Sequence, residues 1–297
     1  TNRLEGDELA CFRDLSGETS LHETLVSFNP DILSLLLEYN ARPSIGDNYG
    51  DTFLHHAAFK GITVPLQATV DFFADKPSEL KTIFHTKNNN QETVLHKACL
   101  GKCPSKSQEV VDIILESFSD LLNVQDSQGN TPLLLAAKYD LELAMYLVGR
   151  GAKTKIKNKQ GENLLHIIMR YAFDKRGVTA FLESETVYRK IYRLVTKKDN
   201  EGITPLHAFA QYAHTQEPVE RILELLLGNL PGSTLENKKY LHQTDKTESL
   251  NSTAEALARV HKHYALANMI ITYPAEDLGA LYRKQRAERG LYTFQTL

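Results

Sequence analysis

The chain has 297 residues, a formal net charge of −3, 42% hydrophobic residues and 24% charged residues. This is the composition of an ordinary globular protein, and it lacks the basic excess that nucleic-acid binding requires. No apolar run approaches the roughly 20 residues that span a bilayer, so we expect neither nucleic acid nor a membrane as a partner. The sequence begins at Thr1 without a secretory signal, and we expect it to be an excised or processed part of a longer polypeptide.

One motif recurs along the chain. It consists of Asp or Asn, a Gly three residues later, and then Thr, Leu, His and Ala in a fixed order, and its clearest copy runs from Asp199 to Ala208. Successive copies are separated by 33, 41, 38, 32 and 41 residues. The Thr position is held by Thr19, Thr52, Thr93, Thr131, Asn163 and Thr204, and a degenerate seventh copy surrounds Thr253.

Each copy of the motif predicts a tight turn followed by a short helix. Asp or Asn bonds to nearby backbone, and Gly accepts the positive φ that such a turn needs. Thr can cap the first turn of a helix through its hydroxyl. Pro suits the first helical position, because that position needs no amide donor, and Pro132 and Pro205 occupy it in two copies.

A second, longer apolar helix follows the motif in several copies. The spacing of apolar residues at i, i+3 and i+4 predicts such helices over residues 32–37, 110–115 and 222–227. The segment from Pro65 to Pro77 predicts an irregular helix pair instead. Residues 149–152 provide glycines that can end a helix. An insertion is expected over residues 174–183, followed by a helix over residues 184–195.

The repeated motif resembles the ankyrin repeat, and the resemblance covers roughly residues 14 to 273. It implies an all-α solenoid of stacked helix-turn-helix units, with about six to seven repeats and irregular insertions. Three positions depart from the pattern: Asn163 replaces Thr, Leu134 replaces His and Gln91 replaces Gly.

The resemblance also divides the chain into three parts. Residues 1–13 are expected to be a linker or an N-terminal capping segment, and residues 14–273 the ankyrin-repeat domain. Residues 274–297 are expected to form an amphipathic C-terminal capping helix. The last segment carries four cations that would equally suit an acidic partner or a membrane surface. They are Arg283, Lys284, Arg286 and Arg289.

The histidines and cysteines of the chain do not indicate catalysis or a metal. The motif histidines recur with the repeat, whereas a catalytic histidine would not, and the family resemblance implies that they form hydrogen bonds between adjacent turns. They are His22, His55, His96, His166 and His207. No nucleophile elbow, phosphate-binding loop or zinc-protease motif is present, so we expect no enzyme, no catalytic residue and no cofactor. A site split between distant repeats remains a third reading.

Three cysteines, Cys11, Cys99 and Cys103, show no disulfide framework, which favours a reducing, cytoplasmic compartment. Cys99 and Cys103 lie near His96, but structural zinc normally has four Cys or His ligands. We therefore expect no metal at these residues.

The resemblance places a protein partner on the concave surface of the stacked repeats, and we expect a monomer with one partner of unknown identity. Positions between the turn Asp or Asn and the Thr are expected to have no packing role. They include Asn48, Tyr49, Asp51, Asn89, Glu92, Glu162, Asn200 and Ile203.

The end of the first helix of each repeat gives a second prediction. Five residues after the His position come Lys60, Gly101, Tyr139, Tyr171 and Tyr212, so three successive repeats carry Tyr and a tyrosine ladder is expected. The alternative is that these rings pack against the adjacent helix. The predicted partner-binding residues are Tyr49, Phe59, Lys60, Lys138, Tyr139, Arg170, Tyr171, Gln211 and Tyr212.

Two functions from different classes follow from the sequence. The first is a non-enzymatic protein–protein interaction module. The second is a targeting or regulatory domain of a larger enzyme whose catalytic domain lies outside this chain. The irregular repeat lengths also resemble ankyrin proteins that intracellular bacteria deliver into host cells as effectors, which would place the protein in the host cytosol. Variable repeats occur in eukaryotic proteins as well.

Overall fold

The computed structural model describes residues 12–27, 29–101, 104–171, 177–212 and 222. The chain divides into two compact units, Thr1–Ala152 and Lys153–Leu297. All the secondary-structure elements that the structure describes are helices, apart from one isolated bridge between Gly46 and Thr52. The predicted all-α class is therefore confirmed.

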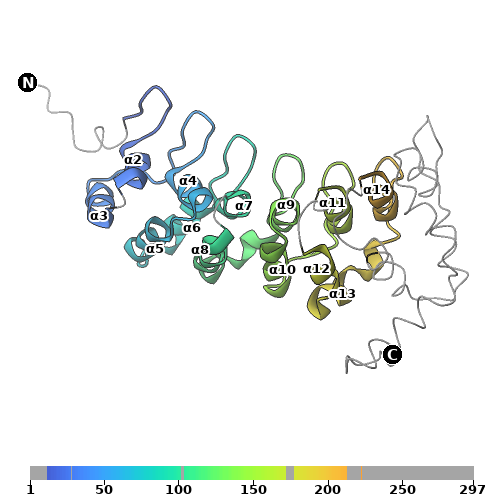
Figure 1. Cartoon of the computed structure of the whole chain (residues 1–297). Helices are drawn as coiled ribbons and strands as arrows, with labels where there is room; N and C mark the ends of the chain where they lie inside the picture. The colour runs from blue at the N-terminus through green and yellow to red at the C-terminus, as the bar shows by residue number, and fades with distance from the viewer. Residues whose placement is uncertain (1–11, 28, 102–103, 172–176, 213–221, 223–297) are drawn as a thin grey trace, which may run out of the picture. The chain divides into compact units, whose positions relative to one another are not determined.

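The inner helices of the first unit are short and begin directly after the motif threonines. They are α2 (Ser20–Ser27), α4 (Phe53–Lys60), α7 (Val94–Leu100) and α9 (Pro132–Tyr139). Figure 1 shows each of them at the base of a projecting hairpin loop, in sequence from blue to green. Helix α2 packs on α4, α4 on α7, and α7 on α9. Small residues such as Ala57 and Ala98 are buried in these contacts, which lets the helices approach closely.

A row of outer helices covers the other side of the inner helices in this unit. The row consists of α3 (Pro30–Glu38), α5 (Thr63–Phe72), α8 (Pro104–Ser117) and α10 (Leu141–Gly149), and a 3-10 turn, η1 (Ser119–Asn123), follows α8. Helix α3 packs on α5, α5 on α8, and α8 on α10. The helices predicted over residues 32–37 and 110–115 lie within α3 and α8.

One repeat of the first unit carries an extra helix, α6 (Pro77–His85), which accounts for its longer step. Pro77 begins this helix, as its fixed φ allows. Pro65, in contrast, lies at the third residue of α5 rather than before it. The irregular helix pair expected between the two prolines is thus one regular helix and the start of a second.

The described part of the second unit contains α11 (Leu164–Tyr171), α12 (Val178–Glu183), α13 (Glu185–Ile191), η2 (Tyr192–Leu194) and α14 (Pro205–Tyr212). Helix α11 packs on α14. The helix predicted over residues 184–195 is divided between α13 and η2, and the insertion before it contains α12. The predictions for residues 1–11, 223–227, the Thr253 copy and residues 274–297 lie outside the described residues.

The hairpin loops of the first unit are joined to one another through their backbones. The Asn48 N–H donates to the Ser16 carbonyl (3.0 Å), and the Asn89 N–H donates to the Tyr49 carbonyl (3.0 Å). This approach is close, since a Cβ added at Gly50 (φ 76°) would lie 2.9 Å from the Asn89 nitrogen. Hydrogen bonds between successive tips therefore hold the loops in a fixed row.

Gln91 replaces the turn Gly and adopts φ 60°. Few residues other than Gly take this left-handed conformation without strain. The turn at residues 88–92 therefore keeps the geometry of the glycine-containing copies at the cost of local strain.

Candidate interaction surface

The motif histidines link each inner helix to the next hairpin. In α4, the Thr52 N–H donates to His55 Nδ1 (3.1 Å), so Nδ1 carries no proton. The proton is then on Nε2, which donates to the Glu92 carbonyl of the next repeat (3.1 Å). His22, His96 and, in the second unit, His166 make the same inter-repeat bond. The predicted hydrogen-bonding role of these residues is confirmed.

These histidines are held neutral. Burial lowers the pKa of both His55 and His166 to about 4, and it also lowers the pKa of His22 and His96. A neutral imidazole with both nitrogens in hydrogen bonds is a structural element rather than a general base. In α9, where Leu134 replaces the His, the Thr131 hydroxyl still accepts the Leu134 N–H (3.4 Å).

The residues just before the motif Thr have packing roles, contrary to the sequence-based expectation. Asp51 and Glu92 are buried, as are Glu162 and Ile203 in the second unit. Lys97 Nζ lies 2.8 Å from Asp51 Oδ2 and 3.7 Å from Glu92 Oε2. The loop conformation directs these side chains toward the inner helices, and the spacing of residues does not reveal that direction.

Asn48, Asn89 and Asn200 also have bonding roles at the hairpins. Each side-chain amide donates to a carbonyl of the preceding hairpin, Leu15, Asn48 and Lys159 respectively. Tyr49 is different, because its side chain is 75% exposed.

Arg170, a predicted partner contact, is bound to carboxylates within the second unit. Its Nη1 lies 2.7 Å from Glu162 Oε1 and its Nη2 lies 3.7 Å from Asp199 Oδ2. The Arg170 side chain is only 18% exposed. Little of this guanidinium is therefore available to a partner.

The first unit places four other predicted partner contacts at the C-terminal ends of two inner helices, α4 and α9. Lys60 is exposed and Phe59 is half-buried at the end of α4. At the end of α9, Tyr139 is 47% exposed, and Lys138 Nζ lies 5.2 Å from the centre of its ring. Such a contact is weakly attractive and holds the ring and the cation together.

Phe59 and Lys138 belong to a row of equivalent positions whose first member, Val26, was not recognised from the sequence. We define the inner row as the side chains four residues after the His position in α2, α4, α7 and α9. They are Val26, Phe59, Leu100 and Lys138. Val26 is 71% exposed. Counting from His22 would have identified it, because the same offset from His55 leads to Phe59.

Gly101 keeps α4 and α7 close beneath this row. A Cβ at this position would lie 2.8 Å from the Phe59 carbonyl oxygen. Because Gly101 has no side chain, the row of predicted tyrosine positions is interrupted between Lys60 and Tyr139.

The tyrosine ladder itself remains a prediction. Tyr139 belongs to the first unit, and Tyr171, exposed at the end of α11, belongs to the second. Gln211 and Tyr212 lie in α14, but their side chains are outside the described part of the structure.

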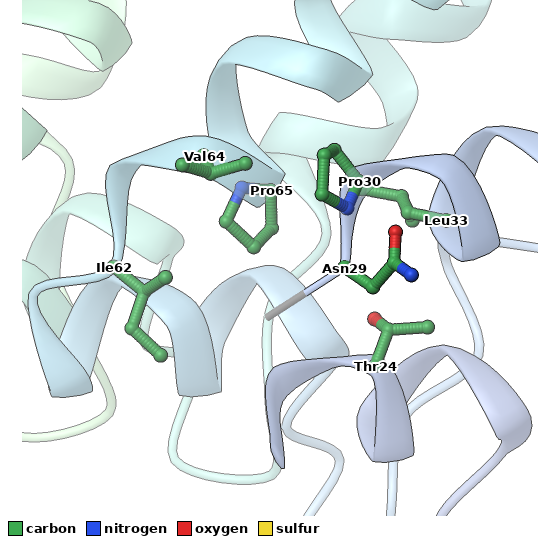
Figure 2. A pocket seen from close by; sticks show the side chains of 7 residues that line it. All are labelled: Thr24, Asn29, Pro30, Leu33, Ile62, Val64 and Pro65. Atoms are coloured by element: carbon green, nitrogen blue, oxygen red, sulfur yellow. The ribbon is translucent and has the colours of Figure 1, made fainter. Parts of the chain in front are cut away.

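A small cavity between α3 and α5 does not provide an alternative site. Figure 2 shows Thr24 and Asn29 on one side of it and Ile62 and Pro65 on the other. Its volume of about 10 Å³ is close to the space that one water molecule requires. The lining residues are Thr24, Asn29, Pro30, Leu33, Ile62, Val64 and Pro65.

Comparison with known families and structures identifies the repeat. The family described as ankyrin repeats (3 copies) matches residues 68–158. The solved ankyrin repeat domain of Bcl-3 superposes with a TM-score of 0.57 at 23% identity, covering 73% of this chain and 85% of that one. The chain is an ankyrin-repeat protein.

Three relatives of this ankyrin-repeat protein differ widely in kind. Human transient receptor potential cation channel subfamily A member 1 is 32% identical over 127 residues, 42% of the chain. Phosphocholine transferase AnkX of Legionella pneumophila is 24% identical over 228 residues, 76% of the chain. The mouse B-cell lymphoma 3 protein homolog is 29% identical over 150 residues, 50% of the chain.

The chain spans only 10%, 19% and 32% of the length of these three relatives. What they share with it is the repeat region. Among its described residues, this ankyrin-repeat protein has no helix long and apolar enough to cross a membrane.

Proposed function

We propose that this ankyrin-repeat protein binds a partner protein through the inner-helix face of its first unit. Ankyrin repeats indicate a protein–protein interaction module. The observation that supports this particular face is the exposure of Tyr49 and Tyr139, at 75% and 47%, on elements held by the hydrogen-bonded hairpins. Tyr provides a large contact area at a low entropic cost, which is why it is enriched at the centres of interfaces.

The charges around this face favour an acidic partner segment. Lys60 is exposed at the end of α4, and Lys138 lies against Tyr139. Two carboxylates at the hairpin bases, Asp51 and Glu92, are buried and ion-paired with Lys97. Asp140, which follows Tyr139, accepts the Glu142 and Leu143 N–H groups at the start of α10. These carboxylates are thus engaged within the protein, whereas Lys60 is exposed. Opposite charges across an interface speed association and select between partners.

Apolar contacts would complement these charges. The inner row offers Val26, Phe59 and Leu100 before it reaches Lys138. An acidic peptide with apolar or aromatic side chains would match both the row and the cations. We propose this chemistry for the partner segment.

Binding without catalysis agrees with the chemistry of the described residues. The motif histidines are neutral and hydrogen-bonded. Cys99 is buried, and burial raises the pKa of its thiol well above the usual range, so the reactive thiolate is suppressed. The most buried titratable groups of the repeats thus have structural roles.

A second candidate function is targeting or regulation within a larger enzyme. The observation in its favour is the similarity to a phosphocholine transferase over 76% of this chain, while the chain covers 19% of that protein. In this case the repeats would position a catalytic domain encoded elsewhere in the polypeptide. The full reading frame tests this alternative, because a recognisable catalytic domain beside the repeats would favour it.

A peptide-display selection tests the proposed face. The face variant carries Lys60→Glu and Tyr139→Ala, and the control variant carries Lys106→Glu and Tyr39→Ala, the same substitutions at exposed positions of the outer helix α8 and the end of α3. We expect native and control proteins to enrich acidic, aromatic-containing peptides and the face variant to lose this enrichment. Equal enrichment by all three proteins would contradict the proposal.

A further inference from the structure

Three potential metal ligands from separate parts of the chain converge at the first two hairpins. Glu18 lies just before α2, Asp47 in the following hairpin and His56 on α4. One ligand atom from each lies within 4.8 Å of the others. The closest pair is Asp47 Oδ2 and His56 Nε2, at 2.9 Å.

The hairpin backbone orients the central carboxylate. Asp47 Oδ1 accepts the Tyr49 N–H (2.8 Å) and the Asp51 N–H (2.9 Å), which fixes the side chain and leaves Oδ2 toward His56. The Asp47 side chain is 5% exposed, whereas that of His56 is 27% exposed. One ligand is thus held rigidly, and another is accessible to an ion from solution.

The surroundings of the three residues are strongly acidic. Glu18 also lies in a second cluster, with Asp14 and Glu23, whose carboxylate oxygens are again within 4.8 Å of one another. Within the described residues, no lysine or arginine forms an ion pair with any of these three carboxylates. Arg13, on the same loop, donates its Nε to the Gly17 carbonyl instead (2.9 Å).

A second His–Asp pair in the first unit shows what is unusual here. His85 Nε2 lies 3.0 Å from Asp120 Oδ2, much as His56 lies from Asp47. The third group at that pair is Lys81, whose Nζ lies 3.2 Å from Asp120. The protein itself therefore supplies a cation at His85, whereas at His56 the third group is the carboxylate of Glu18.

We propose that Glu18, Asp47 and His56 bind a divalent transition-metal ion, with Zn²⁺ the best match. Zn²⁺ accepts imidazole nitrogen together with carboxylate oxygen, whereas Mg²⁺ and Ca²⁺ prefer oxygen ligands alone. His56 binds as the neutral imidazole through Nε2 and carries its proton on Nδ1. Water completes the coordination. The bound ion links the hairpin before α2 to the hairpin before α4.

Metal binding here does not depend on the proposed partner surface. The ligands lie before α2, in the next hairpin and in the first half of α4, whereas Lys60 and Tyr139, which the face variant changes, lie at the C-terminal ends of α4 and α9. The failure of either proposal leaves the other standing.

Isothermal titration of the tag-free protein with Zn²⁺ tests the inference. The Glu18→Gln and His56→Gln variants remove one ligand each from half-buried positions, and His85→Gln is the matched control, because it removes the same residue type from the other His–Asp pair. We expect native and control proteins to bind one Zn²⁺ with equal affinity. The affinity should fall roughly 10-fold or more in Glu18→Gln and be lost in His56→Gln.

Two further readouts separate ligation from folding. The thermal midpoint of the native protein should rise with added Zn²⁺ and that of His56→Gln should not, while both have the same circular dichroism spectrum without metal. Substituted Co²⁺ should give visible absorption bands that the His56→Gln substitution removes. No Zn²⁺ binding by the native protein, or equal binding by His56→Gln, would overturn the proposal.

Discussion

Equivalent positions in the two units have different roles. Lys138 in α9 and Arg170 in α11 both lie four residues after the motif His position. Lys138 lies against the exposed ring of Tyr139, whereas Arg170 is drawn to Glu162 and Asp199 and is largely covered. The residue just before the motif Thr explains the difference, because it is Asn130 in the first case and Glu162 in the second. A carboxylate at that position thus binds and covers the cation, which in α9 lies beside an exposed tyrosine instead.

The largest effect on stability is expected at a buried leucine position that both units share. Leu54 and Leu206 hold the same motif position and are fully buried in α4 and α14. Replacing either with Ala should lower the free energy of unfolding by about 2–5 kcal/mol, through lost burial and a new cavity. Urea denaturation measures the free energy of unfolding of both variants. A negligible change for one of them would mean that the two units do not share the packing described here.

The pH dependence of stability should reflect the buried histidines. Burial, assisted by the nearby charges of Lys157 and Arg170, lowers the pKa of His166 from an unfolded value near 6.5 to about 4. The unfolded chain therefore binds more protons between these two values. Stability is fully present above pH 6.5 and is lost as the pH falls toward 4, by up to about 3 kcal/mol for this residue. Urea denaturation of the native protein and of His166→Asn at pH 7.5 and pH 5 measures this loss. The same drop in unfolding free energy between the two pH values in both proteins would contradict the assignment.

The contrast between Arg170 and Lys138 can be tested directly. Arg170→Ala leaves the buried Glu162 carboxylate without its cation, and it should cost about 1–3 kcal/mol. Lys138→Ala should change stability by less than about 0.5 kcal/mol, as surface substitutions usually do. Equal costs for the two variants would show that the residue before the Thr does not set the role of this position.

The smallest expected stability effect is at Tyr139. Its ring is nearly half exposed, so Tyr139→Ala should shift the free energy of unfolding by less than about 0.5 kcal/mol. A thermal melt provides the measurement, with Tyr39→Ala at another exposed ring as the reference. A drop of several degrees relative to Tyr39→Ala would mean that Tyr139 packs as part of the core.

Much of the fold could be predicted from the sequence because the motif specifies local structure. Each Thr, with its turn residues, located the start of an inner helix, and the apolar spacing located α3 and α8. The extra helix α6 was not separated from α5, because Pro65 fits inside a first helical turn as well as before one. Local signals do not distinguish these two placements.

The candidate sites were less predictable, because they depend on side-chain direction. Asp51, Glu92 and Ile203 were counted as loop-tip residues, yet their side chains point into the protein. The convergence of Glu18, Asp47 and His56 depends on how consecutive hairpins align, which no single motif copy contains. Tyr49 and Tyr139 are exposed, and their role in binding is still a prediction.

Affinity capture from a cell lysate is the most direct test of the proposed binding face. It compares the native protein, the Lys60→Glu/Tyr139→Ala variant and the Lys106→Glu/Tyr39→Ala control at equal loading. The proposal predicts a protein retained by the native and control forms and lost by the face variant, with all three equally folded. Equal retention by the face variant would contradict it and would place the binding surface elsewhere on the repeats.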